Sequence, residues 1–334
     1  MKIALVTPAP AGSTKGNRIS ANRYATLLRE LGHTVHVSTE YDSRDADALV
    51  ALHARRSGRS VQRFHRLHPE RSIIVVLTGT DLYHDLPGNK TALRSLEIAD
   101  RLVTLQPLGI EALPARYRKK AVSIIQSAEA FPETWAEDRA AAAERRKRTG
   151  RFRVLQLAHL RPVKDPFLIA RATRFLREDS AVEIHHAGEA LQPGSSERAL
   201  RLMHTNPRYA WVGNCSHRSA KRRLAKSDLL VLSSKLEGGA NVICEALAVE
   251  VPVVCSRIPG SVGLLGRDYP GYFPVGDAKA LARLLVIAST DGIAYGRLER
   301  ACRMLKKLVT PARERSHGRR LLRSCRVGRR TDQL

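Results

Sequence analysis

The sequence is poor in the features that mark several common classes of protein. Its five cysteines are scattered without Cys-x-x-Cys spacing, so neither a disulfide framework nor a zinc site is expected. No apolar run approaches the roughly 20 residues that span a bilayer, so stable membrane insertion is not expected. Aromatic residues make up only 5% of the chain, which is few for stacking on single-stranded nucleic acid.

Two familiar phosphate-binding motifs are also missing. The first apolar run, Lys2 to Thr7, leads into a loop that lacks the Gly-Lys-Ser/Thr of a Walker loop. The same loop lacks Gly-x-Gly-x-x-Gly, so a dinucleotide is not expected to bind there. The loop is nevertheless suited to an anion or a polar ligand. Its candidate ligand-binding residues are Gly12, Ser13, Lys15, Gly16, Asn17 and Arg18.

Acidic residues are scarce relative to basic ones. The chain has 32 Asp and Glu against 57 Lys and Arg, a formal net charge of +25. Such an excess is found in proteins that bind nucleic acids, membrane surfaces or small anions. No zinc finger or RNA-binding module accompanies it, so a nucleic-acid partner is not expected. We interpret most of the charge as solvated helix faces in an Arg-rich chain, with a local share serving anionic substrates.

Length and patterning predict two domains. A chain of 334 residues is long for one domain, and strands alternate with helices in both halves. We expect an N-terminal Rossmann-like domain in residues 1–148, a second in 149–305 and a basic helix or tail in 306–334. The strand-free, charged segment 132–150 is interpreted as the connection. The opening residues 1–8 suit a first strand better than a signal peptide, so a cytoplasmic protein is expected.

Short apolar runs mark the expected strands. In the first half they cover residues 2–7, 35–38, 46–51, 73–77, 101–105 and 121–125, and in the second half 152–157, 182–186, 210–213, 229–233 and 251–256. Helical spacing separates them, for example over residues 19–31, which end at Gly32. This alternation predicts two doubly wound α/β domains with parallel sheets that face one another across a cleft.

The most informative stretch is residues 233–254, in which a strand ends in a glycine pair before a helix. Free amides at a helix N-terminus attract phosphate, and glycine lets the backbone approach a ligand. Glu237 and Glu245 bracket this segment and would repel phosphate, so they suit hydrogen bonds from sugar hydroxyls. A nucleotide sugar combines these groups. A Gly-Gly turn with a surface or capping Glu is the alternative explanation, because such turns are common.

Polar residues also follow other strands of the predicted sheets. Arg161 and Lys164 follow the strand 152–157 and could clamp a diphosphate, or they could be a solvated pair of charges. Thr78, Gly79 and Thr80 follow the strand 73–77. Each of these sites taken singly is compatible with ordinary turn chemistry.

The segment SSKLEGGANVICEA, placed in the second of two such domains, resembles the family-4 glycosyltransferases of the GT-B fold. That family has two glutamates separated by seven residues, as Glu237 and Glu245 are. The resemblance implies that Glu237 lies near the transferred sugar and that Glu245 binds the ribose. Further donor-binding residues are implied at Gly238, Gly239, Ala240, Asn241, Val242, Trp211 and Gly213. A basic pair is also implied: Lys164 matches its lysine, but the arginine position is His159, so either His159 or Arg161 assists Lys164.

Longer blocks resemble the selenosugar synthases of selenoneine biosynthesis. They include LTGTDLY, ALRSLEIADRLVTLQP, HLRPVKDPF and LEGGANV. The resemblance implies transfer of N-acetylglucosamine from UDP-N-acetylglucosamine to selenophosphate, which forms a C–Se bond and releases UDP. Lys164, Arg161 and Glu237 would be the catalytic residues. Lys15, Asn17, Arg18 and the Thr78–Thr80 segment are the candidates for binding the acceptor.

The expected chemistry needs neither a strong base nor a metal. Selenophosphate is already an anionic nucleophile, and UDP charge would be stabilised by cations and by helix amides. No cofactor is therefore expected, and the sequence is interpreted as offering no Asp-x-Asp motif to hold a metal. A family-4 transferase with an ordinary hydroxyl acceptor is the alternative within this class, and a basic nucleic-acid-binding protein is the alternative outside it.

Overall fold

The computed structural model describes residues 1–13, 16–128 and 134–325 of the chain. Contacts between residues separate two compact units. The first comprises Met1–Gln126, Glu237–Gly239 and Ala312–Leu334, and the second comprises Ser127–Leu236 and Ala240–Pro311. The first unit is thus assembled from three segments, whereas the sequence predicts one division near residue 148 and a separate tail.

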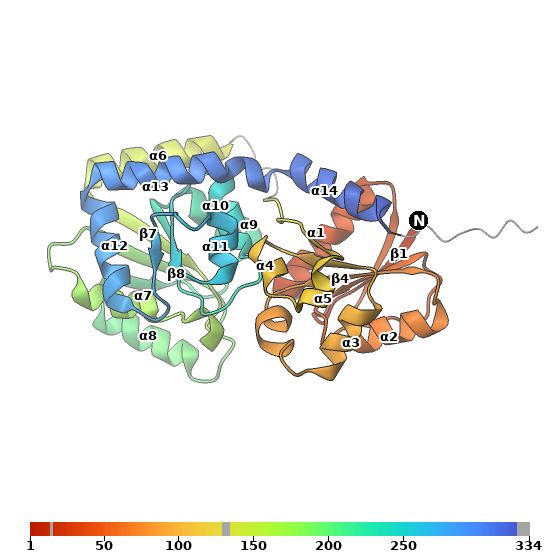
Figure 1. Ribbon diagram of the computed structural model, residues 1–334. Helices are drawn as coiled ribbons and strands as arrows, with labels where there is room; N and C mark the ends of the chain where they lie inside the picture. Colours follow the sequence, from red (N-terminus) through yellow and green to blue (C-terminus); the bar gives the residue numbers. More distant parts are fainter. Residues whose placement is uncertain (14–15, 129–133, 326–334) are drawn as a thin grey trace, which may run out of the picture. The chain divides into compact units, whose positions relative to one another are not determined.

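A six-stranded parallel sheet forms the middle of the first unit (Figure 1). Its strands, in spatial order, are β2 (Thr34–Ser38), β1 (Lys2–Val6), β3 (Ala48–Leu52), β4 (Ser72–Leu77), β5 (Arg101–Thr104) and β6 (Ala121–Ser123). The chain runs outward from β1 to β2 and then continues on the other side of β1 with β3. The sheet is therefore doubly wound, with its switch point between β1 and β3.

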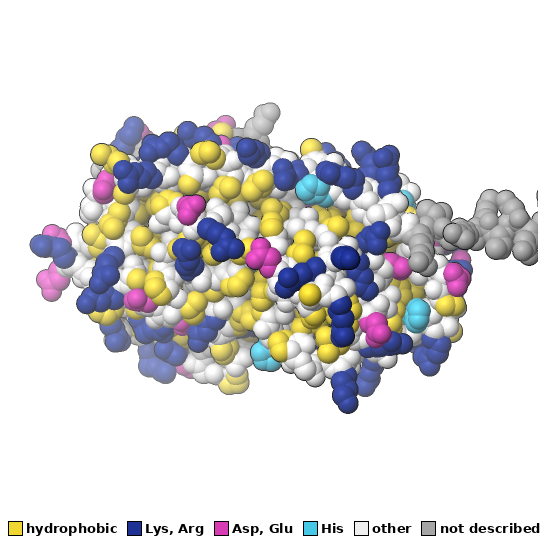
Figure 2. All heavy atoms as spheres, viewed as in Figure 1, with side chains coloured by type: hydrophobic (Ala, Val, Ile, Leu, Met, Phe, Trp, Pro, Cys, Tyr) yellow, Lys and Arg dark blue, Asp and Glu magenta, His cyan; other side chains and the backbone are white. Residues whose placement is uncertain are grey.

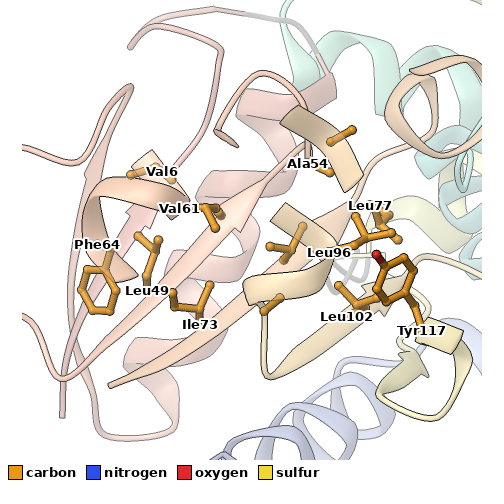
Figure 3. Packing of buried hydrophobic residues seen from close by; sticks show 14 of the residues in the cluster. Val6, Leu49, Ala54, Val61, Phe64, Ile73, Leu77, Leu96, Leu102 and Tyr117 are labelled. Carbon is orange, nitrogen blue, oxygen red and sulfur yellow. The ribbon is translucent and has the colours of Figure 1, made fainter. Parts of the chain in front are cut away.

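Helices cover both faces of this sheet. They are α1 (Gly16–Glu30), α2 (Gly58–Leu67), α3 (Lys90–Ile98), α4 (Leu108–Glu111), α5 (Ala115–Arg118) and α14 (Pro311–Arg323). Strands β3 and β4 are buried along their whole length, which explains why they read as unbroken apolar runs. On one face, Leu49 and Ile73 pack with Val61 and Phe64 of α2 and Leu96 of α3 (Figure 3).

The C-terminal helix α14 belongs to the core of the first unit. Leu321 and Leu322 are buried in the cluster that covers the other face of the sheet, together with Leu27 and Leu28 of α1. Gly318 lets the helices approach closely, because a side-chain carbon there would lie 3.2 Å from a methyl group of Leu27. Figure 1 shows α14 in blue beside α1 in red.

The second unit is built around another six-stranded parallel sheet. In spatial order its strands are β12 (Tyr272–Phe273), β11 (Val253–Ser256), β10 (Leu229–Leu232), β7 (Phe152–Leu157), β8 (Val182–Ala187) and β9 (Tyr209–Trp211). The chain runs from β7 outward to β9 and then starts again at β10 on the other side of β7. This is the 3-2-1-4-5-6 order of a doubly wound sheet, with its switch point between β7 and β10.

The helices of the second unit complete the fold. They are α6 (Thr134–Thr149), α7 (Leu168–Ala172), α8 (Ser195–Thr205), α9 (His217–Ala225), α10 (Asn241–Ala248), α11 (Pro259–Leu265), α12 (Ala278–Thr290) and α13 (Gly292–Leu305). The prediction of two doubly wound parallel sheets is confirmed. Among the helices of the described residues, none combines the length and the hydropathy that a membrane span requires.

Helix α6 occupies most of the segment that the sequence predicts as a connection. It is anchored on the second unit, because Arg139 donates a hydrogen bond of 2.6 Å to the Ser227 carbonyl. Arg145 and Arg146 form ion pairs with Asp228, which is buried at the start of β10. Residues 132 and 133 lie outside the described residues.

Candidate functional site

In each unit, residues of the candidate site follow the strands that flank the switch point. The loops after β7 and β10 carry Lys164 and Ala240 in the second unit. In the first unit the loops after β1 and β3 carry Gly12 and His53, and Thr78–Thr80 follows the neighbouring strand β4. Ligands of doubly wound sheets bind at such points, outside the carboxyl ends of the strands.

Lys164 lies in a short 3-10 turn, Pro162–Lys164, that is fastened to the end of β10. The buried Ser233 hydroxyl lies 2.9 Å from the carbonyl oxygens of both Lys164 and Asp165, and it accepts a hydrogen bond from Gln156. The amide of Lys235 donates to the Val163 carbonyl at 2.8 Å. Residues from both sides of the switch point therefore fix the backbone that carries the Lys164 ammonium.

His159 and Arg161 differ in how they are held. The Nδ1 atom of His159 accepts a hydrogen bond of 3.1 Å from the Glu189 amide, so this ring is tied to the loop after β8. Arg161 precedes the 3-10 turn with an extended backbone, and its guanidinium forms no ion pair or side-chain hydrogen bond with any described residue. Arg161 thus retains its hydrogen-bond donors for an anion near Lys164.

Helix α10 begins at Asn241, directly after Ala240. The N-cap residue of this helix, Ala240, has no polar side-chain group to offer, while its carbonyl accepts the amides of Ile243 and Cys244. The first amides, those of Asn241 and Val242, are therefore available to a ligand oxygen. Helical spacing predicts a helix over residues 242–248, so α10 starts one residue before its predicted start.

Glu245 lies one turn into α10 and has a partner that the sequence does not reveal. The Nε2–H of His217, at the start of α9, donates a hydrogen bond of 2.9 Å to Glu245 Oε1. The Glu245 side chain is mostly buried, whereas that of His217 is half-exposed. One carboxylate oxygen is thus oriented by His217, and the other remains a hydrogen-bond acceptor.

Trp211 and Gly213 lie at the carboxyl end of the edge strand β9. The indole of Trp211 donates a hydrogen bond of 2.9 Å to the Gly188 carbonyl, and the amide of Gly188 donates to the Gly213 carbonyl at 2.8 Å. A side-chain carbon at Gly188 would lie 1.9 Å from the Ala158 carbonyl oxygen. Only glycine fits there, so the loops after β7, β8 and β9 are packed backbone against backbone.

His186 supports these loops from below. Its Nε2–H donates to the Ala158 carbonyl at 2.8 Å, and its Nδ1 accepts a hydrogen bond of 2.7 Å from the Tyr209 hydroxyl. Burial lowers the pKa of His186 from 6.5 to about 4, against the smaller opposing effect of the Ala158 carbonyl. The ring is therefore neutral at pH 7.

This depressed pKa predicts a specific loss of stability in acid. The unfolded chain takes up the His186 proton near pH 6.5 and the folded chain only near pH 4. The contribution of the neutral His186 ring to the free energy of unfolding is therefore fully present above pH 6.5. It is lost as the pH falls, by about 3 kcal/mol at pH 4. We expect the urea midpoint of the wild type to fall between pH 6.5 and pH 4 by the amount that this contribution predicts. The control variant His204→Gln, which changes an exposed histidine, should show the same fall. His186→Gln should lack it, and an equal acid loss in all three proteins would refute the assignment.

In the first unit, the loop after β1 leads directly into α1. Gly12 has a φ of 77°, which favours glycine, and the Ser13 amide donates to the Pro10 carbonyl. The Asn17 carbonyl accepts a hydrogen bond from Thr7 at the end of β1. The Nε atom of Arg18 is buried and has no hydrogen-bond partner among the described residues. Lys15 lies outside the described residues.

The loop after β4 is organised by Asp81, which is fully buried. Its Oδ1 accepts the amides of Thr78 and Gly79, each at 2.9 Å, and its Oδ2 accepts the amide of Ala54 at 2.9 Å. The carboxylate thus joins the ends of β3 and β4. Glu237–Gly239 is packed on this loop within the same unit: a side-chain carbon at Gly238 would lie 2.6 Å from the Thr78 carbonyl.

His53, which the sequence reasoning did not select, completes this group. It is buried at the end of β3 with a φ of 74°. Its Nδ1 accepts the Arg56 amide at 3.3 Å, so in the neutral ring Nε2–H donates to the Thr80 hydroxyl at 3.2 Å. Burial, the largest effect, lowers the pKa of His53. The ring of His53 is therefore neutral, and its hydrogen bond orients the Thr80 hydroxyl.

The sequence does contain an Asp-x-Asp motif, Asp45 and Asp47, so the interpretation that it offers no such motif to hold a metal is wrong. These residues precede β3 and therefore lie at the amino end of the sheet, away from the loops described above. Asp47 accepts the Lys2 amide at 2.7 Å, and Asp45 pairs with Arg71 at 2.7 Å. Within the described residues, no group of three or more His, Cys, Asp or Glu side chains is arranged to hold a metal ion.

Similarity to solved structures identifies the class of fold. The chain matches HepE of Anabaena, solved in complex with UDP, with a TM-score of 0.73 and 16% identity over 97% of this chain and 100% of that one. It matches the sucrose-phosphate synthase of Thermosynechococcus elongatus with a TM-score of 0.76 and 16% identity, covering 96% of this chain and 98% of that one. The two parallel-sheet units are those of GT-B glycosyltransferases.

Sequence similarity identifies the family. Residues 137–303, half of the chain, match the family described as glycosyl transferases group 1. The chain belongs to this family and is a transferase enzyme. It is also 29% identical over 126 residues to TuaC of Bacillus subtilis, a protein assigned by name to teichuronic acid biosynthesis. That match covers 36% of this chain and about a third (32%) of the length of TuaC.

Proposed function

We propose that the enzyme transfers a sugar from a nucleotide sugar and that the second unit binds the donor. The observation that carries this proposal is the grouping at its switch point. An uncapped helix N-terminus at Asn241 and two cations, Lys164 and Arg161, suit a diphosphate. Glu245, oriented by His217, suits ribose hydroxyls. The UDP complex of the structurally similar HepE agrees with a UDP-linked donor.

The finer proposal is transfer of N-acetylglucosamine from UDP-N-acetylglucosamine to selenophosphate. It rests on the sequence blocks that resemble selenosugar synthases. Selenium attacks the anomeric carbon, a C–Se bond forms, and the bond from that carbon to the diphosphate oxygen breaks. Lys164, Arg161 and the helix amides would stabilise the charge that develops on UDP, without a metal ion. Glu237 would bind the transferred sugar.

The state of His53 supports an acceptor that needs no deprotonation. Both of its ring nitrogens are engaged, one with the Arg56 amide and the other with Thr80, and burial disfavours its protonated form. Such a ring is better placed to orient a hydroxyl than to remove a proton. Selenophosphate arrives as an anion, so Thr78, Thr80, Asn17 and the buried Nε of Arg18 would act only as donors.

Transfer to an ordinary hydroxyl acceptor is the second candidate, and the observation that favours it is the buried, neutral imidazole of His53 at the end of β3. Rearrangement of its hydrogen bond to Thr80 on substrate binding would allow His53 to act as a base. His53→Gln separates the two cases. It would lower kcat for a hydroxyl acceptor about 100-fold or more, whereas kcat with selenophosphate would change little.

The donor assignment is tested by UDP binding, measured calorimetrically. We expect Glu245→Gln to weaken UDP binding about tenfold or more, because hydrogen bonds to a charged acceptor are worth about 1.5–3 kcal/mol. Glu197→Gln, which removes an exposed carboxylate on α8 of the same unit, is the matched control and should bind like the wild type. Equal affinities for all three proteins would refute the role of Glu245, and absence of UDP binding in the wild type would refute a UDP-linked donor.

A further inference from the structure

The second unit contains a cavity that the proposed reaction does not use. It has a volume of about 370 Å³ and opens to solvent. The residues that line it are Arg153, Leu155, His185, Ser219, Arg222, Arg223, Lys226 and Ser227. Four of these eight residues are Arg or Lys, and none is Asp or Glu. We call this the basic cavity.

The basic cavity exists because two facing surfaces are polar where a covered sheet is usually apolar. Ser219, Arg222, Arg223 and Lys226 follow the spacing i, i+3, i+4, i+7, so they form one stripe of α9 and the residue after it. On the sheet side, Arg153 and Leu155 of β7 are two residues apart, so their side chains point to the same face of the sheet. His185 of β8 is the register partner of Leu155. Leu155 is the one large apolar side chain of the lining, and it does not fill the space alone.

The cations in the basic cavity are incompletely paired. The Nε atoms of Arg153 and Arg223 are buried and have no hydrogen-bond partner among the described residues. No carboxylate in the described part of the chain forms an ion pair with Arg222 or Arg223. Buried unpaired donors cost free energy, and native structures keep few of them.

Two carboxylates act on Arg153 and His185 of the lining, and both have partners outside the lining: Asp228 acts on Arg153, and Glu183 acts on Arg153 and lies 4.0 Å from His185. Asp228 pairs with Arg145 and Arg146 and accepts the Arg153 amide, and Glu183 pairs with Arg151. Among the lining cations, and within the described residues, only the ammonium of Lys226 forms an ion pair, with Asp138 at 3.4 Å. Burial and then the charge of Arg145 lower the pKa of Arg153 against the opposing charges of Glu183 and Asp228, and burial and then Arg153 lower the pKa of His185 against the opposing charge of Glu183. The four lining cations outnumber these carboxylates, so the local charge is positive.

The basic cavity is separate from the donor residues of the same unit. Arg153 is near the amino end of β7, whereas His159 and Lys164 follow its carboxyl end. Strands rise about 3.3 Å per residue, so Arg153 and Leu157 are roughly 13 Å apart along the strand. An anion held by Arg153 and Arg223 would not occupy the diphosphate position beside Lys164.

We propose that the basic cavity binds a small anion that carries a phosphate or diphosphate group. Guanidinium groups recognise phosphate oxygens through paired hydrogen bonds, and the Ser219 hydroxyl adds a neutral donor. The volume matches that of small-ligand sites, which begin near 300 Å³. The lining residues include no Phe, Tyr or Trp on which a base could stack, which disfavours single-stranded nucleic acid.

The test measures binding of inorganic phosphate, inorganic diphosphate and glucose 6-phosphate by calorimetry at constant ionic strength. Diphosphate can also enter the donor site, so Lys164→Ala serves as the background protein. Into it we introduce Arg222→Gln, Arg223→Gln or, as a matched control, Arg201→Gln, which changes an exposed arginine of α8. We expect both cavity variants to weaken binding of at least one of these anions at least tenfold and the control to leave it unchanged.

Thermal melting shows whether the variants remain folded. Removing one of four neighbouring cations should leave the melting temperature without ligand unchanged or higher, and Arg222 is exposed on α9, so its replacement does not disturb the core. A preference for diphosphate or for glucose 6-phosphate would specify the anion. Affinities that are equal in the cavity variants and the control would overturn the proposal. Binding confined to nucleic acid or to anionic vesicles, with none of the three small anions bound, would overturn it as well.

Discussion

Deletion of residues 311–334 is expected to unfold the first unit. The deletion removes Leu321 and Leu322, each worth about 1.5–3 kcal/mol when buried, from a core that they share with α1. It also leaves Arg23 without Glu314, whose two oxygens lie 2.9 and 3.1 Å from the Arg23 Nε. The sum, about 5 kcal/mol or more, is comparable to the whole stability of many domains. Calorimetric melting should therefore show loss of one transition.

A point variant separates the helix contact from the general effects of truncation. Glu314→Gln should lower the free energy of unfolding by about 3 kcal/mol, because Glu314 is 4% exposed and its loss strands the Arg23 charge. Arg315→Gln is the matched control, since Arg315 makes only an exposed pair with Glu30 at 3.5 Å. If the truncated protein or Glu314→Gln melted like the control, α14 would have no structural role.

Replacement of Lys164 by Ala is expected to lower kcat about 100- to 1,000-fold, which is typical for loss of one preorganised donor to developing charge. Its backbone is fixed by Ser233 and Lys235, so the ammonium is held in place before the leaving group forms. Initial rates of nucleotide release measure the effect. Lys164→Arg should recover part of the activity because the charge is kept.

Lys279→Ala provides the control for this variant, since Lys279 is an exposed lysine on α12 of the same unit. It should retain the wild-type rate. A Lys164→Ala enzyme within threefold of the wild type, with the control also active, would show that Lys164 does not stabilise the leaving group.

The strands were predictable because a strand that is buried on both faces appears in the sequence as an unbroken run of apolar residues. Phe152–Leu157 was predicted with the bounds observed, and β4 differs by one residue. Helical spacing predicts that α9 starts at Ser219, but the helix begins at His217, because Ser216, which caps it by accepting the Ser219 amide, lies outside the apolar pattern. The predicted strand 251–256 begins at Val253, after Pro252, which cannot donate to a neighbouring strand.

The position of the C-terminal helix was not predictable from local pattern. Arginines dominate the residues after 311 and conceal the spacing of Gly318, Leu321, Leu322 and Cys325 that faces the core. The partner of Glu314 is Arg23, separated from it by 291 residues. The sequence pattern around either residue does not predict an ion pair between them.

Candidate site residues were found where they follow strand ends and missed where they depend on distant contacts. Lys164, Glu245 and Thr80 stand beside recognisable strand or helix boundaries. His53 and His217 acquire their importance from hydrogen bonds to Thr80 and Glu245, 27 and 28 residues away. The sequence did offer one signal for these two residues: His53 follows the end of a strand, and His217 stands at the start of a helix.

An assay of the reaction products shows directly whether the enzyme transfers a sugar from a nucleotide sugar, and to which acceptor. Purified enzyme is incubated with UDP-N-acetylglucosamine, with and without freshly made selenophosphate, and the products are analysed by mass spectrometry. We expect a selenium-containing sugar together with UDP, dependent on selenophosphate and lost in Glu237→Ala and Lys164→Ala. Release of UDP with only an oxygen-linked product would contradict the selenophosphate acceptor, and neither binding nor turnover of any nucleotide sugar would contradict the account as a whole.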